Sequence, residues 1–237
     1  MGAYRFPFRP LLTVVSVIAL ALLVTLGSWQ MRRLEWKQSL IAQVEARVDA
    51  APIPFAEAVR RAAAGETMEY MPVTIAGRVK GQNEARVFGT YDGAPGVYIF
   101  APVETGAGPV YVNRGFAPQE NLDVPCFCDD DAEEEIITGL FRTAEKPSPP
   151  ASWFQPKGKS VDGLWYIRDP KAFAADAGLN APAYYIDQSA VDGRDWPKGG
   201  TTRLDFNNRH LEYALTWFGL AATLAGVWVA FSLKKRD

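Results

Sequence analysis

The chain has 237 residues, enough for one or two domains with a buried core. Hydrophobic residues make up 48% of it, charged residues 22%, and the net charge of −2 offers no basic field for nucleic acid, so we expect no nucleic-acid partner. One histidine and two cysteines exclude a disulfide framework and a histidine-based metal cluster.

Residues 10–31 contain no charged side chain and no histidine. As a helix they would be about 33 Å long, which matches a hydrocarbon core of about 30 Å. We predict a first transmembrane helix here, with Trp29 at its outer interface. A cleaved signal peptide is the alternative, but the apolar stretch exceeds the usual length of about 7–15 residues, and no small-residue cleavage site follows it.

The middle of the chain, residues 32–209, reads as one domain outside the membrane. Helical spacing over residues 30–48 predicts that the first helix continues until Pro52 and Pro54 stop it. A period of two then predicts short strands, and further helices are expected at 55–64 and 169–178. The strands are predicted at 73–79, 85–90, 96–103, 109–116, 134–142, 164–168 and 183–188. We expect a β-rich α+β domain, a small barrel or sandwich, rather than a parallel α/β sheet.

Residues 210–233 predict a second transmembrane helix, because 213–233 carry no charge and show no polar stripe. Ala222 and Gly226 have a small-xxx-small spacing, which favours close packing against the first span.

Two spans place both termini on one side. Basic residues on the termini (Arg5, Arg9, Lys234, Lys235, Arg236) outnumber those just beyond the first span (Arg32, Arg33, Lys37), so we predict cytoplasmic termini and an external domain.

No catalytic constellation is visible. A single histidine allows no conventional Ser-His-Asp triad, and no glycine-rich phosphate loop occurs, so we expect a non-enzyme. A membrane-tethered enzyme is the competing interpretation. Cys126 and Cys128 could bind a soft metal such as Cu(I), but two ordinary loop cysteines are the preferred reading, since such sites usually recruit more ligands.

The single histidine, His210, lies at the head of the second span, where Asn207 and Asn208 are candidate caps of the helix. Residues on its helical face are Tyr213, Ala214 and Trp217. Imidazole is a common axial ligand of haem iron, and arginines near the same boundary could pair with propionates: Arg32, Arg33, Arg203 and Arg209. An interfacial histidine that anchors the helix beside aromatic rings explains the same residues, and these residues alone leave both interpretations open.

Three segments together resemble the surfeit locus protein one family, the assembly factors of haem-copper cytochrome c oxidase. The first is LGSWQMRRLEWKQSLI (26–41), with Gly27, Trp29 and Gln30. The second is VYVNRGFAP (110–118), with Asn113, Arg114 and Gly115, where Phe116 replaces the family's usual tryptophan. The third is NNRHLEYALTWFGLAA (207–222), and ITGLFRTAEKP and LWYIRDP are similar to the family's central blocks.

The resemblance implies a non-enzymatic helper of oxidase assembly that binds haem a through His210 and assists its insertion into the catalytic subunit. It also implies haem a synthase as a partner, and interaction or structural roles for the Gly-x-Trp-Gln and Asn-Arg-Gly blocks. No transit segment precedes the first span, so a multi-pass protein of the bacterial inner membrane with a periplasmic domain is expected. The alternative is a scaffold that stabilises an oxidase assembly intermediate without binding haem.

Overall fold

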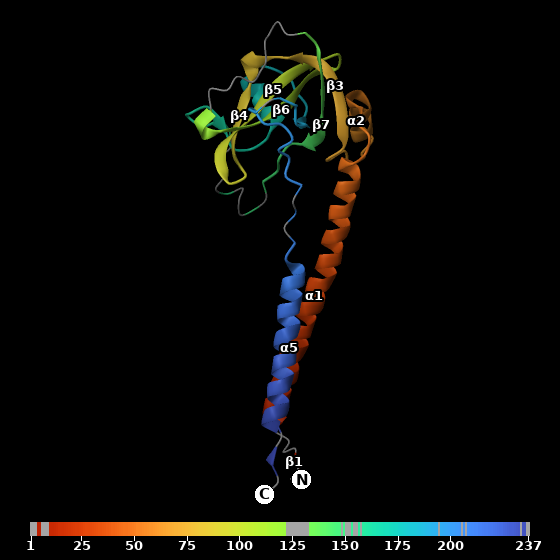
Figure 1. Cartoon of the computed structure of the whole chain (residues 1–237), viewed down its shortest axis with the longest axis vertical. Helices are drawn as coiled ribbons and strands as arrows, with labels where there is room; N and C mark the ends of the chain where they lie inside the picture. Colours follow the sequence, from red (N-terminus) through yellow and green to blue (C-terminus); the bar gives the residue numbers. More distant parts are fainter. Residues whose placement is uncertain are drawn as a thin grey trace. The chain divides into compact units, whose positions relative to one another are not determined.

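The computed structural model describes residues 4–5, 10–121, 133–147, 149, 153, 156, 158–193, 195–204, 206, 208–232 and 234–235. The cysteine pair predicted at Cys126 and Cys128 lies outside these residues. The chain divides into two compact units (Figure 1). One contains Met1–Gln43 and Asp205–Asp237, and the other contains Val44–Leu204.

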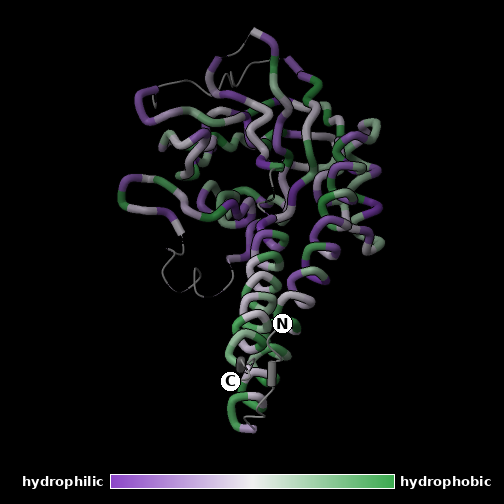
Figure 2. The backbone as a smooth tube through the Cα atoms, turned by 60° about the horizontal axis from the view of Figure 1, so that its bottom comes forward, coloured by the Kyte–Doolittle hydropathy of each residue, from purple (hydrophilic) through white to green (hydrophobic). Residues whose placement is uncertain are grey.

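The first unit is a pair of antiparallel helices. Helix α1 (Pro10–Val48) is continuous, so the predicted extension of the first apolar helix is confirmed, and α5 (His210–Ser232) is the second apolar helix. Both are hydrophobic over most of their length and long enough to cross a membrane (Figure 2). The short strands β1 (Tyr4–Arg5) and β10 (Lys234–Lys235) pair with each other, so these two segments lie at the same end of the helix pair.

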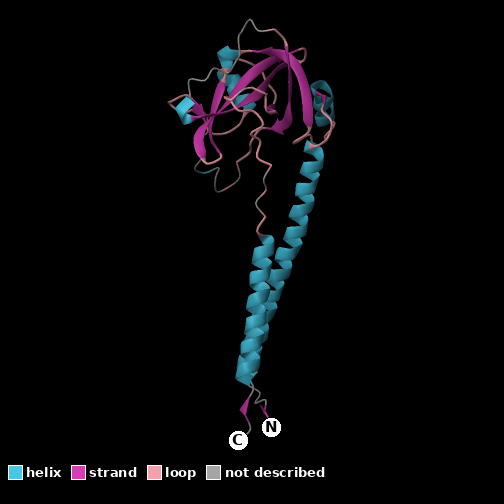
Figure 3. Cartoon of the chain, viewed as in Figure 1, coloured by secondary structure: helices cyan, strands magenta, loops and turns pink. Residues whose placement is uncertain are grey.

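The second unit is the predicted β-rich domain with short helices (Figure 3). Its strands are β2 (Ile53–Pro54), β3 (Pro72–Val79), β4 (Ala85–Tyr91), β5 (Ala94–Thr105), β6 (Gly108–Pro118), β7 (Glu135–Thr143), β8 (Leu164–Trp165) and β9 (Tyr184–Gln188). Its helices are α2 (Phe55–Ala63), α4 (Pro170–Asp176) and the 3-10 turns η1 (Gly81–Asn83) and η2 (Gln119–Asn121).

Two strands differ from the sequence-based expectation. The strand expected at 164–168 is only two residues long, because the backbone then leaves β4 and the Arg168 carbonyl accepts a hydrogen bond from the amide of Glu145 instead. Strand β2 was not predicted. It pairs in parallel with β3, but two residues are too few to show a period of two.

The sheet closes on itself. Its strand order is β2-β3-β7-β9-β6-β5-β4-β8, and β3 also pairs with β5 through Arg78–Glu104 and Val79–Val103. Strands β3, β7, β9, β6 and β5 therefore form a hydrogen-bonded ring. Most neighbours are antiparallel, but β6 and β9 are parallel, so residues far apart in sequence face each other directly.

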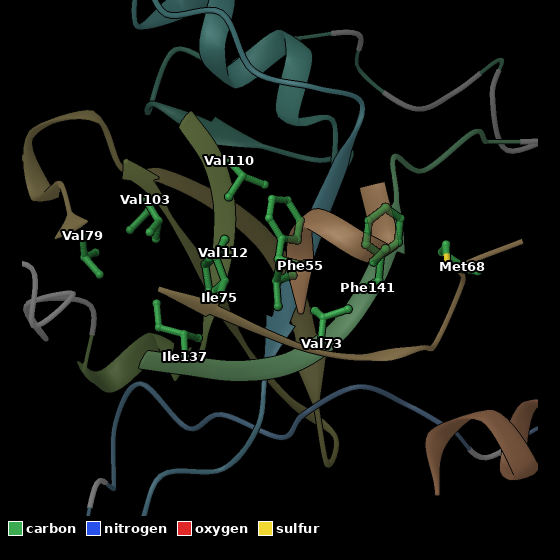
Figure 4. Packing of buried hydrophobic residues seen from close by; sticks show 13 residues of the cluster. Phe55, Met68, Val73, Ile75, Val79, Val103, Val110, Val112, Ile137 and Phe141 are labelled. Atoms are coloured by element: carbon green, nitrogen blue, oxygen red, sulfur yellow. The ribbon is translucent and has the colours of Figure 1, made fainter. Parts of the chain in front are cut away.

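Apolar side chains fill the interior of this ring (Figure 4). Phe55 and Ala58 of α2 join residues from all five strands of the ring in one buried cluster. A second cluster covers the other face of β5, β6 and β9 and packs against Phe173 of α4. Because β5 and β6 are covered on both faces, Asn113 and Arg114 are forced into the protein interior.

Candidate functional site

His210 is the first residue of α5, and its ring contacts the other apolar helix. Its Nδ1 atom lies 2.7 Å from Oε1 of Gln30 on α1. The two residues are 180 positions apart, and both side chains are half-buried. The ring has no second hydrogen-bond partner in the part of the chain that the structure describes. One ring nitrogen, Nδ1, is therefore engaged by Gln30 of the neighbouring helix.

The two helices approach closely next to this contact. Gly27 lies one turn before Gln30, and a Cβ atom added to it would lie 2.7 Å from the ring of Phe218 on α5. Ala214, one turn after His210, is fully buried. Absence of a side chain at Gly27 thus creates the space that the Phe218 ring occupies, which keeps α1 near enough for Gln30 to reach His210.

The small-residue face predicted on α5 is wrong. Ala222 and Gly226 are exposed, and a Cβ atom on Gly226 would meet nothing within 4 Å. The buried small residues are Ala214 and Ala221 instead. Positions seven apart recur on one helical face, so these two alanines form the seam while Gly226 lies off it.

The other residues predicted to bind haem are near the surface. Tyr213 is 54% exposed, Trp217 is half-buried, and Arg32, Arg33 and Arg209 are exposed. The Arg33 guanidinium lies over the Trp36 ring, 3.8 Å from its centroid, and Trp29 is half exposed on the same helix. The structure therefore joins His210 to Gln30 and leaves the three arginines accessible to an anionic group.

The helix start at His210 is not capped by Asn208. Its carboxamide oxygen is buried and accepts no hydrogen bond from any described residue. The first turn is closed by the backbone, because the Tyr213 amide donates to the Arg209 carbonyl at 3.2 Å. The predicted capping by Asn208 is therefore wrong, and Asn207 lies outside the described residues.

The second family-like segment lies in the β-domain and is buried. Asn113 donates through Nδ2 to Oδ1 of Asp187 at 2.8 Å and accepts the Gly115 amide at 3.1 Å. Gly115 has a φ of 136°, and an added Cβ atom would lie 2.3 Å from the Lys198 backbone. Only glycine combines this backbone angle with so close a neighbour. These residues hold β6 against β9 and the segment that follows β9.

A lone arginine at the end of a strand is expected to be solvated, but Arg114 is not. Its side chain is fully buried and pairs through Nη1 with Glu135 at the start of β7. Its Nε and Nη2 atoms have no partner among the described residues. A guanidinium with no exposed surface cannot meet a docking partner, so the position supports the structural role rather than the docking role.

The sequence-based interpretation missed the acidic centre of this region. Asp187 is 3% exposed and also accepts hydrogen bonds from Arg142 at 2.8 Å and from Thr202 at 2.9 Å, while Arg142 donates to Glu69 at 2.7 Å. Burial alone would lower the pKa of Arg142, but Tyr185, Asp187 and Glu69 together raise it above its ordinary value. No motif marks these residues, since they come from separate strands and loops.

The β-domain also contains a groove of about 810 Å³. Phe55 and Val59 of α2, the Thr105–Val110 turn and Pro182 form much of its lining. Arg60 and Lys171 are its charged lining residues, and both are exposed. Among the described residues, no group of three or more His, Cys, Asp and Glu side chains could hold a metal ion.

Comparison with known proteins agrees with the resemblance of the three segments. The model of the SURF1 family matches residues 17–222. The chain is 33% identical over 233 residues to Surfeit locus protein 1 of Gallus gallus, covering 89% of this chain and 72% of that protein. It is 32% identical over 225 residues to Surfeit locus protein 1 of Homo sapiens, covering 86% and 71%. A SURF1-like protein of Rickettsia felis is 28% identical over 229 residues, covering 92% of this chain and 95% of its own length. The chain belongs to the SURF1 family.

Proposed function

We propose that this protein is a membrane-anchored assembly factor of haem-copper cytochrome c oxidase, which binds haem a and assists its insertion into the catalytic subunit. Membership of the SURF1 family supports the role in oxidase assembly. The observation that carries the haem proposal is the single histidine, held by Gln30 through Nδ1 at 2.7 Å, with no hydrogen bond from its other nitrogen to any described residue.

In this proposal α1 and α5 cross the inner membrane of a bacterium. Both helices carry apolar side chains that are largely exposed, for example Leu11 at 78% and Leu215 at 64%. Such surface is unfavourable in water and suits lipid. The basic residues of the termini support cytoplasmic ends and a periplasmic β-domain.

The residues at the paired helix ends fit haem a. His210 would supply the imidazole ligand, Tyr213 and Trp217 would supply aromatic surface, and the arginines that would pair with the propionates are Arg32, Arg33 and Arg209. When bound, haem a would supply an iron centre that an imidazole can ligate. The protein's own part is to hold and present the group, so its action is that of a chaperone rather than an enzyme. Its partners are then the oxidase catalytic subunit and haem a synthase.

An absorption spectrum of the purified full-length protein, made in cells that synthesise haem a, tests this function. Wild-type protein is expected to carry haem a, and His210→Ala to lose most of it while the β-domain stays folded. Arg33→Ala should lose less, because it removes one exposed charge. Thr216→Ala is the matched control, since this exposed hydroxyl on the same helix donates to the Glu212 carbonyl.

Two results would contradict the haem proposal. An unchanged haem a spectrum in His210→Ala would show that the ligand assignment is wrong. Wild-type protein that never carries haem a, in cells whose oxidase assembly still depends on it, would replace the haem-binding function by that of a scaffold.

A further inference from the structure

We propose that Gln30 is a positioning residue that holds His210 in the tautomer whose hydrogen is on Nδ1, and so keeps a lone pair on Nε2 for a ligand. The ligand part rests on the proposed haem function, whereas the tautomer is a property of the haem-free protein. The glutamine of the Gly-x-Trp-Gln segment then has a chemical task.

The donor and acceptor atoms of this contact decide the tautomer. A neutral imidazole carries one N–H donor and one acceptor nitrogen. A carboxamide oxygen only accepts, so its 2.7 Å contact with Nδ1 requires the hydrogen to be on Nδ1. Nε2 is then the nitrogen with the lone pair. If the amide of Gln30 were reversed, its NH₂ group would donate to Nδ1, the hydrogen would move to Nε2, and the neutral ring could not bind iron through Nε2.

The fold keeps Gln30 in place from both sides. Gly27 precedes it by one turn and lets the Phe218 ring lie against α1. Ala214 follows His210 by one turn and is fully buried. The histidine is at the first residue of α5, where its backbone is held by the helix but its ring still reaches α1. Both partners are therefore fixed by helix packing, which is how a supporting group fixes the orientation of a metal-binding histidine.

Three variants separate the chemical task from a merely structural one. Gln30→Glu keeps an acceptor facing Nδ1 and should preserve the tautomer. Gln30→Leu keeps the bulk of the side chain but removes the acceptor. Gln38→Leu is the matched control, because Gln38 is exposed on the same helix.

The first measurement is ¹⁵N NMR of the full-length, haem-free protein labelled at histidine and kept at alkaline pH, where an imidazole is neutral. The chain has one histidine, so the two ring signals belong to His210. We expect a protonated Nδ1 and an unprotonated Nε2 in wild type, Gln30→Glu and Gln38→Leu, and loss of this preference in Gln30→Leu. A protonated Nε2 in wild type, or an unchanged spectrum in Gln30→Leu, would overturn the proposal.

The second measurement is haem a retention by the same variants, read from the absorption spectrum. Loss of a group that orients a ligand typically lowers affinity about 10–100-fold, which is the decrease expected for Gln30→Leu. Gln30→Glu and Gln38→Leu should retain haem a. Equal retention by Gln30→Leu and wild type would refute the positioning role and leave haem binding intact. Wild type without haem a would refute the proposed function, while the NMR result still decides the role of Gln30.

Discussion

Asn113 on β6 and Asp187 on the parallel strand β9 form a buried hydrogen bond of 2.8 Å from Nδ2 to Oδ1. The two residues are 74 positions apart in the sequence. Asp187 is also the acceptor for Arg142 and Thr202, so one carboxylate joins β6, β7, β9 and the segment after β9.

Asp187→Ala should strongly destabilise the β-domain. Removal of the carboxylate leaves the Asn113 amide without its acceptor and takes one of two anions from Arg142. Breaking a buried charged pair in this way typically costs about 3–5 kcal/mol. Thermal unfolding of the detergent-solubilised protein measures the loss. The control is the exposed Asp192→Ala, and equal melting temperatures for the two variants would contradict the importance of this network.

The Arg114–Glu135 pair should respond unequally to loss of its two members. Glu135→Ala leaves a fully buried guanidinium without its anion and should cost about 3–5 kcal/mol. Arg114→Met removes the buried charge, and Glu135 is 39% exposed, so water can solvate it. We therefore expect Arg114→Met to be the milder variant in urea unfolding, and the reverse order would show that the arginine itself stabilises the domain more than its partner does.

Stability of the β-domain should fall in alkali. Burial raises the pKa of Tyr111 to about 12, from an ordinary value of 10.0, so the unfolded chain loses this proton at lower pH than the folded one. Stability that is complete below about pH 10 is then lost between about pH 10 and 12, by about 3 kcal/mol for two pKa units. Tyr111→Phe should reduce the difference between urea midpoints at about pH 8 and about pH 11. An unchanged difference would mean that Tyr111 has the same pKa in the folded and unfolded states.

Gly27→Leu should separate the two apolar helices. Its side chain would need the space of the Phe218 ring, and overpacking of this kind costs about 1–3 kcal/mol. The ¹⁵N signals of His210 report the result, because the Gln30 contact is lost when the helices move apart. Gly219→Leu on α5 meets nothing within 4 Å at its Cβ atom and should leave these signals unchanged. If both variants behave alike, the contact of Gly27 with Phe218 is not what holds the helix ends together.

The proposed topology predicts where fused reporters are active. A reporter at the C-terminus should work only in the cytoplasm. One inserted at the exposed Asp92–Gly93 turn between β4 and β5 should work only in the periplasm. The opposite pattern would reverse the orientation and keep the two-span arrangement. Activity of both reporters on the same side of the membrane would mean that one apolar helix fails to cross.

Much of the secondary structure could be predicted from local patterns. The uncharged runs 10–31 and 213–233 mark α1 and α5, and the change to a period of two at Val73 marks β3 and the strands after it. Such features depend on residue type and on spacing between residues that lie within one helical turn, or within a few positions of a strand. Family-like segments also singled out Gln30, Asn113 and His210, but not what each of them contacts.

The sequence by itself determined where the apolar helices lie, that the domain between them is rich in strands, and that one imidazole is available. Only the tertiary structure decided that Gln30 faces His210, that Asp187 gathers Asn113, Arg142 and Thr202, and that Ala214 rather than Gly226 lies in the helix seam. The physical reason is that these relationships depend on helix rotation and strand register. Both are set by packing between segments up to 180 residues apart, and no local spacing encodes them.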